Sequence, residues 1–102
     1  MEYNKLVRDR IPELIESSGK RFTGRIALSG EVALFAAKKL REEIEEFIEN
    51  PCAEEAADIL EILNFICVRE GIRENTIVAE AFSKRIKRGG FDSGFILEWV
   101  ED

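Results

Sequence analysis

The chain has 102 residues, 45% of them hydrophobic, and a formal net charge of −6 at pH 7. This length corresponds to one domain with a modest core, and the hydrophobic content argues against intrinsic disorder. The sequence has no histidine, which excludes Ser-His-Asp and Cys-His triads, the usual Cys/His zinc site and the usual di-iron site. It contains no apolar run of the ~18 residues that span a membrane, and its start does not resemble a signal peptide. We therefore expect a cytoplasmic protein with no membrane partner and, given its acidity, no nucleic-acid partner.

The N-terminal third is predicted to hold an arm and a short helix. Residues 1–8 form the arm. Asp9 can cap a first helix that tolerates Pro12 in its first turn and ends near Ser17, before a glycine. Residues 22–28 are expected to be irregular or a short strand.

Two long helices are predicted for the middle of the chain. Ser29 can cap a helix that reaches about Glu49. Asn50 and Pro51 then form a strong boundary, with asparagine as the cap and proline as the first residue of the next helix. That helix is expected to end near Glu70, before a glycine.

A fourth helix is predicted from about Asn75 to Arg88, and a pair of glycines ends it. Residues 95–100 are either a strand that pairs with residues 22–28 or a final turn packed on the helices. The pattern as a whole predicts an all-α fold in which residues 1–102 form a single domain around a four-helix-bundle-like core.

Negative charge is concentrated in one window of the chain. Residues 42–61 contain nine acidic residues and no basic residue. The other residues therefore carry a net charge of +3. One acidic centre is expected to be surrounded by a mildly basic protein.

The second helix directs one of these acids into its apolar face. On a helix that advances ~100° per residue, Glu43 lies within the arc that Val32, Ala36 and Phe47 define. Glu46 lies at the edge of that arc. A carboxylate is therefore predicted among the core residues, with a second one beside it.

The third helix repeats this arrangement. Glu55 lies within the arc of Ile59, Ile62 and Ile66, and Asp58 lies at its edge. Burying unpaired carboxylates costs several kcal/mol each, so about four converging acids need a cation. Lysines on these helices are too few, and a divalent ion held by oxygen ligands, preferably Mg²⁺, is the simplest solution.

These elements resemble a known superfamily, the all-α nucleotide pyrophosphohydrolases, which include MazG-like proteins and phosphoribosyl-ATP pyrophosphohydrolase. The segment 42–46, Glu-Glu-Ile-Glu-Glu, is similar to the family's Glu-Glu-x-x-Glu element, and residues 55–58, Glu-Ala-Ala-Asp, are similar to its Glu-x-x-Asp element. Residues 3–12 and the segment 88–91, Arg-Gly-Gly-Phe, resemble a single-domain subgroup described as phosphoribosyl-ATP pyrophosphohydrolase-like.

The resemblance implies a four-helix core, dependence on Mg²⁺ with Mn²⁺ as a substitute, and hydrolysis of a nucleotide to a monophosphate and pyrophosphate. It also implies that the metal ligands are Glu43, Glu46, Glu55 and Asp58. Glu42 would be an auxiliary ligand or would orient the attacking water, so the catalytic candidates are Glu42 and Glu43. The substrate-binding candidates outside the acidic window are Lys5, Arg8, Lys39, Asn64, Lys84, Lys87 and Arg88.

Several of these residues have a second interpretation. Lys39 is placed to pair with Glu43 or Glu46 on its own helix. Lys5 and Arg8 are as consistent with surface pairing as with phosphate contact, and Asn64 is as consistent with a polar border position as with a base or sugar contact.

The whole chain also has alternative interpretations. A non-catalytic acidic helical interaction module would show no metal dependence, whereas a phosphodiesterase or phosphomonoesterase would keep the metal and give other products. A homodimer or higher homo-oligomer is expected, with Phe95 and Trp99 in the core or at the subunit interface.

Overall fold

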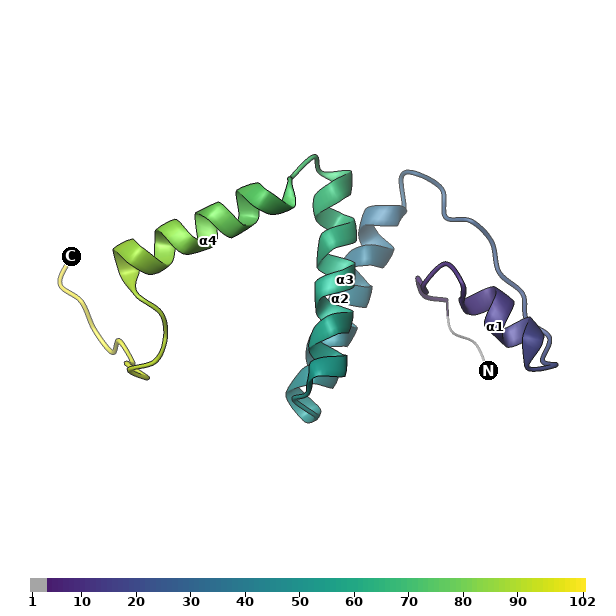
Figure 1. Ribbon diagram of the computed structural model, residues 1–102, viewed down its shortest axis with the longest axis horizontal. Coiled ribbons are helices and arrows are strands. Elements are labelled where there is room, and N and C mark those ends of the chain that lie inside the picture. Colours follow the sequence, from purple (N-terminus) through teal and green to yellow (C-terminus); the bar gives the residue numbers. More distant parts are fainter. Residues whose placement is uncertain (1–3) are drawn as a thin grey trace.

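The computed structural model describes residues 4–102 and shows an all-α fold there, with no strand (Figure 1). This confirms the predicted fold class. The four helices are α1 (Ile11–Ser17), α2 (Val32–Glu49), α3 (Ala53–Arg69) and α4 (Glu74–Arg88).

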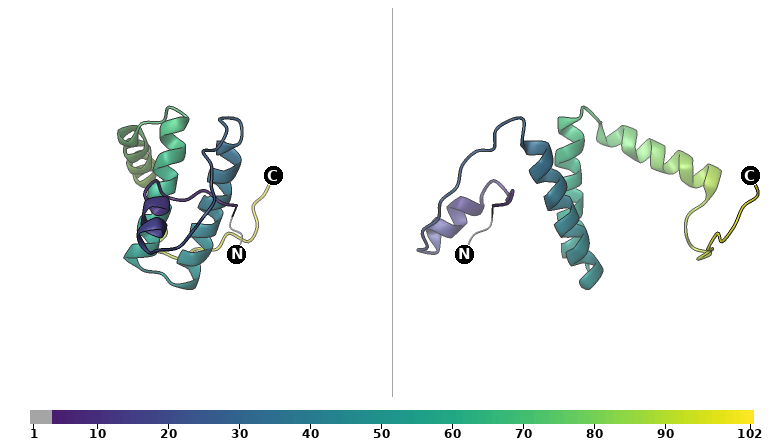
Figure 2. Two further views of the ribbon diagram at one scale, coloured as in Figure 1. Left: turned by 90° about the vertical axis from the view of Figure 1, so that its right-hand side faces the viewer. Right: turned by 180° about the vertical axis from the view of Figure 1, so that it is seen from behind.

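The core lies between α2 and α3, which run antiparallel as a hairpin joined by residues 50–52 (Figures 1 and 2). They form the one extensive helix–helix packing in the described part of the chain. Its most buried apolar residues are Val32 and Ala36 of α2 with Ile62 and Cys67 of α3. Val32 and Ala36 are four residues apart and share one face of α2, whereas Ile62 and Cys67 lie about 140° apart around α3.

Both central helices begin later than the sequence predicts. The carboxylate of Glu31 pairs with Arg25 and accepts a hydrogen bond from the Leu28 backbone N–H at 2.9 Å, so residues 28–31 form a turn and α2 starts at Val32. Cys52 is extended, with φ −156°, and α3 therefore starts at Ala53 rather than at the proline two positions earlier.

The predicted strand pair is absent. Residues 22–28 and 95–100 are both irregular, and they lie on opposite sides of the hairpin (Figure 1). A pair of two isolated strands is marginally stable in water, and nothing in this arrangement brings the two segments together.

The molecule is elongated, with extents of 59 × 31 × 27 Å. α1 lies on one side of the hairpin, and α4 leads away on the other (Figures 1 and 2). Of the helices between residues 4 and 102, none combines the length and the hydropathy of a membrane-spanning segment.

Candidate metal centre

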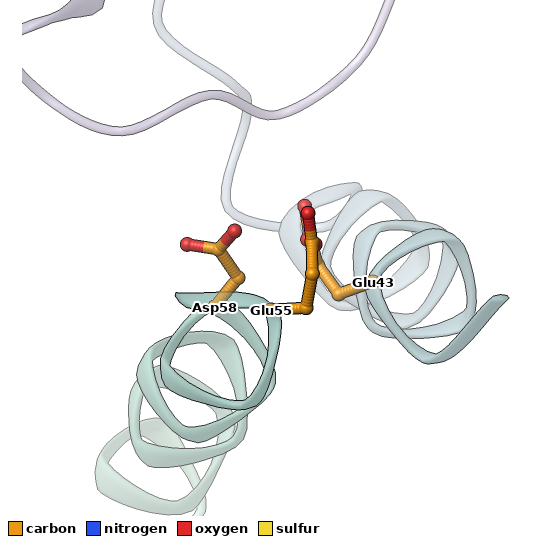
Figure 3. Close-up of side chains that lie close together, drawn as sticks. All are labelled: Glu43, Glu55 and Asp58. Carbon is orange, nitrogen blue, oxygen red and sulfur yellow. The ribbon is translucent and has the colours of Figure 1, made fainter. Parts of the chain in front are cut away.

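Three carboxylates meet between α2 and α3. Glu43 of α2 and Glu55 and Asp58 of α3 each offer an oxygen, and these oxygens lie within 4.8 Å of one another. All three side chains point to the same side of the hairpin (Figure 3). Because the helices are antiparallel, the inward-directed acid of α2, Glu43, and that of α3, Glu55, lie at the same height along the packed pair. The inward placement predicted for Glu43 and Glu55 is confirmed.

Two oxygens of this cluster are buried without a hydrogen-bond partner among the described residues, Oε2 of Glu43 and Oε2 of Glu55. Glu43 itself is only 5% exposed. A buried carboxylate oxygen with no partner costs the full desolvation of that group. The donor set consists of oxygens alone, which is the set that Mg²⁺ and Ca²⁺ bind. These residues therefore fit a hard divalent cation.

Lys39 supplies part of the compensating charge. Its Nζ lies 3.0 Å from Glu43 Oε1 and 3.6 Å from Glu42 Oε1. Partial burial lowers the pKa of Lys39, but its pairing with Glu43 and Glu42 outweighs burial and raises the pKa above its ordinary value. The ammonium therefore stays charged and neutralises one oxygen of Glu43, while the other oxygen keeps no partner.

The N-terminal arm supplies two more cations. Lys5 donates a hydrogen bond to Glu42 at 2.9 Å, and Arg8 donates one to Asp58 at 2.7 Å. The bond from Lys5 holds the pKa of the Glu42 carboxyl below its usual range, with further help from Lys39. The sequence identifies both arm residues as candidates, but it gives no signal for these pairings, because the partners are 37 and 50 positions apart.

Glu46 stands one turn beyond Glu43 and is exposed, outside the three-carboxylate cluster. The negative charge of Glu43 raises the pKa of Glu46, and desolvation, Glu55 and Glu42 add to the shift. Glu46 therefore lies within electrostatic reach of the cluster. Its role as a fourth ligand remains a prediction.

The remaining substrate-binding candidates lie elsewhere. Asn64 lines a shallow hollow at the α3–α4 turn. It follows Glu55 by nine positions, which is about two and a half turns of an α-helix, so the two side chains lie on opposite faces of α3. The cations Lys84, Lys87 and Arg88 belong to α4, which leads away from the hairpin (Figure 1). Within one chain these four residues are not brought to the acidic cluster.

Comparison with models of known families, with curated proteins and with solved structures finds no match to this chain. Fold and site together define an all-α protein with a carboxylate-rich candidate cation site between two antiparallel helices.

Proposed function

We propose that this chain is a Mg²⁺-dependent nucleotide pyrophosphohydrolase, which cleaves the α–β phosphate bond of a nucleotide to give a monophosphate and pyrophosphate. The observation that carries the proposal is the three-carboxylate cluster with its two buried, partnerless oxygens. The similarity of the two acidic motifs to the all-α nucleotide pyrophosphohydrolases supplies the reaction.

In this proposal Glu43, Glu55 and Asp58 hold the ion, and Glu46 completes the set. A bound Mg²⁺ would neutralise negative charge on the phosphate oxygens and lower the pKa of a coordinated water. The protein's contribution is to fix the three carboxylates on two packed helices, so that little reorganisation is needed when the ion binds.

Glu42 is proposed to orient the attacking water by accepting a hydrogen bond from it. Lys5 and Lys39 both approach Glu42 Oε1, at 2.9 and 3.6 Å. These cations keep the carboxylate ionised, as its lowered pKa indicates. An ionised Glu42 remains an acceptor for water at neutral pH.

Arg8 is proposed to exchange partners when substrate binds. In the structure its guanidinium pairs with Asp58, whose side chain is one-third exposed. A cation bound at Asp58 would compete with Arg8 for that carboxylate. The guanidinium would then be available for the phosphate oxygens, which it can hold with two parallel hydrogen bonds.

The proposal also includes a nucleotide as substrate, a homodimer or higher homo-oligomer as the active form and a cytoplasmic location. Lys84, Lys87 and Arg88 remain candidates for phosphate contact in such an assembly, since within one chain they lie apart from the acids.

Pyrophosphate release tests the reaction directly. Standard, deoxy and modified nucleoside triphosphates and phosphoribosyl-ATP would be incubated with the protein in Mg²⁺ and in EDTA. We expect metal-dependent pyrophosphate that is lost in Glu43→Ala and retained in Glu45→Gln, an exposed acid on the same helix. Release of orthophosphate without pyrophosphate would count against cleavage at the α–β bond.

An acidic interaction module is the second candidate. It is favoured by the acids outside the cluster, which lie exposed along the hairpin as a surface for a basic partner, namely Glu45, Glu49, Glu54 and Glu61. No pyrophosphate from any substrate, together with no Mg²⁺ or Mn²⁺ binding by calorimetry, would support this function and contradict the first.

A further inference from the structure

The two carboxylate oxygens of Glu43 have different surroundings. Oε1 lies 3.0 Å from the ammonium of Lys39, whereas Oε2 is buried and has no hydrogen-bond partner among the described residues. Glu43 also contributes an oxygen to the group that it forms with Glu55 and Asp58 (Figure 3). One carboxylate therefore stands between an ammonium that belongs to the protein and the candidate cation site.

Lys39 reaches two successive acids of α2 at once. Glu42 and Glu43 follow it by three and four positions, so the three side chains are neighbours on the helix surface. The Nζ atom lies 3.0 Å from Glu43 Oε1 and 3.6 Å from Glu42 Oε1. In two-metal sites the ions lie about 3.5–4 Å apart, which requires carboxylates within reach of both. The ammonium of Lys39 fills the place beside the three-carboxylate cluster where a second ion would find two carboxylates.

Lys39 is also the least exposed of the three cations around the cluster. Its side chain is 19% exposed, against 35% for Lys5 and 55% for Arg8. Lys39 belongs to α2, which packs along α3. Lys5 and Arg8 belong to the arm that precedes α1. The ammonium of Lys39 is therefore held in place by the packed hairpin itself.

The formal charges around the cluster lack the charge of one divalent ion. Five acids and three cations are paired there or lie within electrostatic reach, namely Glu42, Glu43, Glu46, Glu55 and Asp58 with Lys5, Arg8 and Lys39. Five negative and three positive charges leave −2, which one divalent ion would neutralise. A second ion would leave +2 in a partly buried site without substrate, and burying uncompensated charge is costly.

We propose that the ammonium of Lys39 takes the place of a second metal ion, so that the substrate-free site binds a single divalent cation. This inference rests on the cation site of the proposed function. Glu55, Asp58 and the second oxygen of Glu43 hold the ion, while Lys39 holds Glu42 and Glu43 Oε1. Lys39 is then a positioning residue, because it fixes Glu42 beside the ion and its ammonium is occupied by carboxylates instead of substrate phosphate.

The test counts the ions that bind to the full chain without nucleotide. Mn²⁺ is titrated by calorimetry and by electron paramagnetic resonance, in which two neighbouring Mn²⁺ ions couple and broaden the spectrum. We expect one uncoupled Mn²⁺ per wild-type chain. Lys39→Met, which keeps the length of the side chain and removes its charge, should double the stoichiometry to two coupled ions. Lys38→Met removes the same charge from an exposed position of the same turn and should still bind one.

Two coupled ions in the wild type would overturn the proposal without any variant. A single ion in folded Lys39→Met would also overturn it, as would a second ion in Lys38→Met. Circular dichroism reports folding, and Lys39→Gln, whose amide can still donate to Glu43, gives the same comparison if Lys39→Met unfolds. No Mn²⁺ bound to the wild type would remove the proposed cation site together with this role of Lys39. One ion in every protein would leave that site in place and refute the role of Lys39 alone.

Discussion

Replacing Glu43 by glutamine separates the electrostatics of the cluster from its ability to bind a cation. Glu43→Gln keeps the shape of the side chain and removes its charge. Two effects oppose each other in the metal-free protein. The change removes repulsion from Glu55 and Asp58, whose oxygens lie within 4.8 Å, and it removes the attraction of Lys39 at 3.0 Å.

At an effective dielectric constant of ~20, each repulsion is worth about 3.5 kcal/mol and the attraction about 5.5 kcal/mol. Two repulsions against one attraction nearly cancel. Screening at Asp58, whose side chain is one-third exposed, reduces its repulsion further. We therefore expect the free energy of unfolding without metal to change by no more than about 1–2 kcal/mol.

With metal the two proteins should differ clearly. A cation at 100 times its dissociation constant stabilises the wild type by about 2.7 kcal/mol. If the loss of one anionic ligand weakens binding 100-fold, the same concentration gives Glu43→Gln only about 0.4 kcal/mol. For a chain of this size the difference corresponds to roughly 9–18 °C in melting temperature.

The assay is thermal unfolding by circular dichroism, with MgCl₂ or MnCl₂ added at a fixed protein concentration. Glu45→Gln is the matched control, because it makes the same chemical change at an exposed position of α2. A wild-type melting temperature that neither ion raises would refute the reasoning, as would an equal rise in Glu43→Gln.

Three further predictions concern the surroundings of the site. Glu46 should titrate above its ordinary pKa in a carbon-detected NMR titration and move back in Glu43→Gln, since Glu43 is the largest cause of the shift. Because the folded state binds this proton more tightly, the contribution of Glu46 to stability should fall as pH rises through its folded-state pKa, and this contribution should be smaller in the variant. Arg8→Gln should change the free energy of unfolding by less than about 1 kcal/mol, because in its pair with Asp58 the arginine is 55% and the aspartate 33% exposed. It should also raise KM for the nucleotide about tenfold; an unchanged KM in steady-state kinetics would argue against phosphate contact. Gly71→Ala should destabilise the protein by about 1–2 kcal/mol in urea unfolding through its positive φ alone, since no atom lies within 4 Å of the added Cβ.

The sequence predicts the central helices and their inward acids because both signals are local. Apolar residues at helical spacing define the buried face, and the position of Glu43 or Glu55 relative to that face follows from helix geometry alone. The structure confirms both placements. Antiparallel packing of two such helices then brings Asp58 beside them.

Features that depend on distant parts of the chain could not be predicted in this way. The pairing of Glu31 with Arg25 delays the start of α2, and a capping rule applied to Ser29 cannot detect it. The contact between Arg8 and Asp58 joins residues 50 positions apart. Periodicity also shows that α4 is amphipathic, but not which surface covers it.

Burial of the cluster favours one of its two candidate uses. A basic protein partner would approach from outside and pair with exposed acids such as Glu45 and Glu49. It could not reach Oε2 of Glu43 or of Glu55, which have almost no accessible surface, without inserting a whole side chain between α2 and α3. A single ion is far smaller than a side chain, and Asp58, whose side chain is one-third exposed, borders the cluster on the solvent side. These two oxygens therefore favour a cation site over a docking surface. Burying a carboxylate oxygen without a partner costs free energy, and binding a basic protein at the surface does not require that burial.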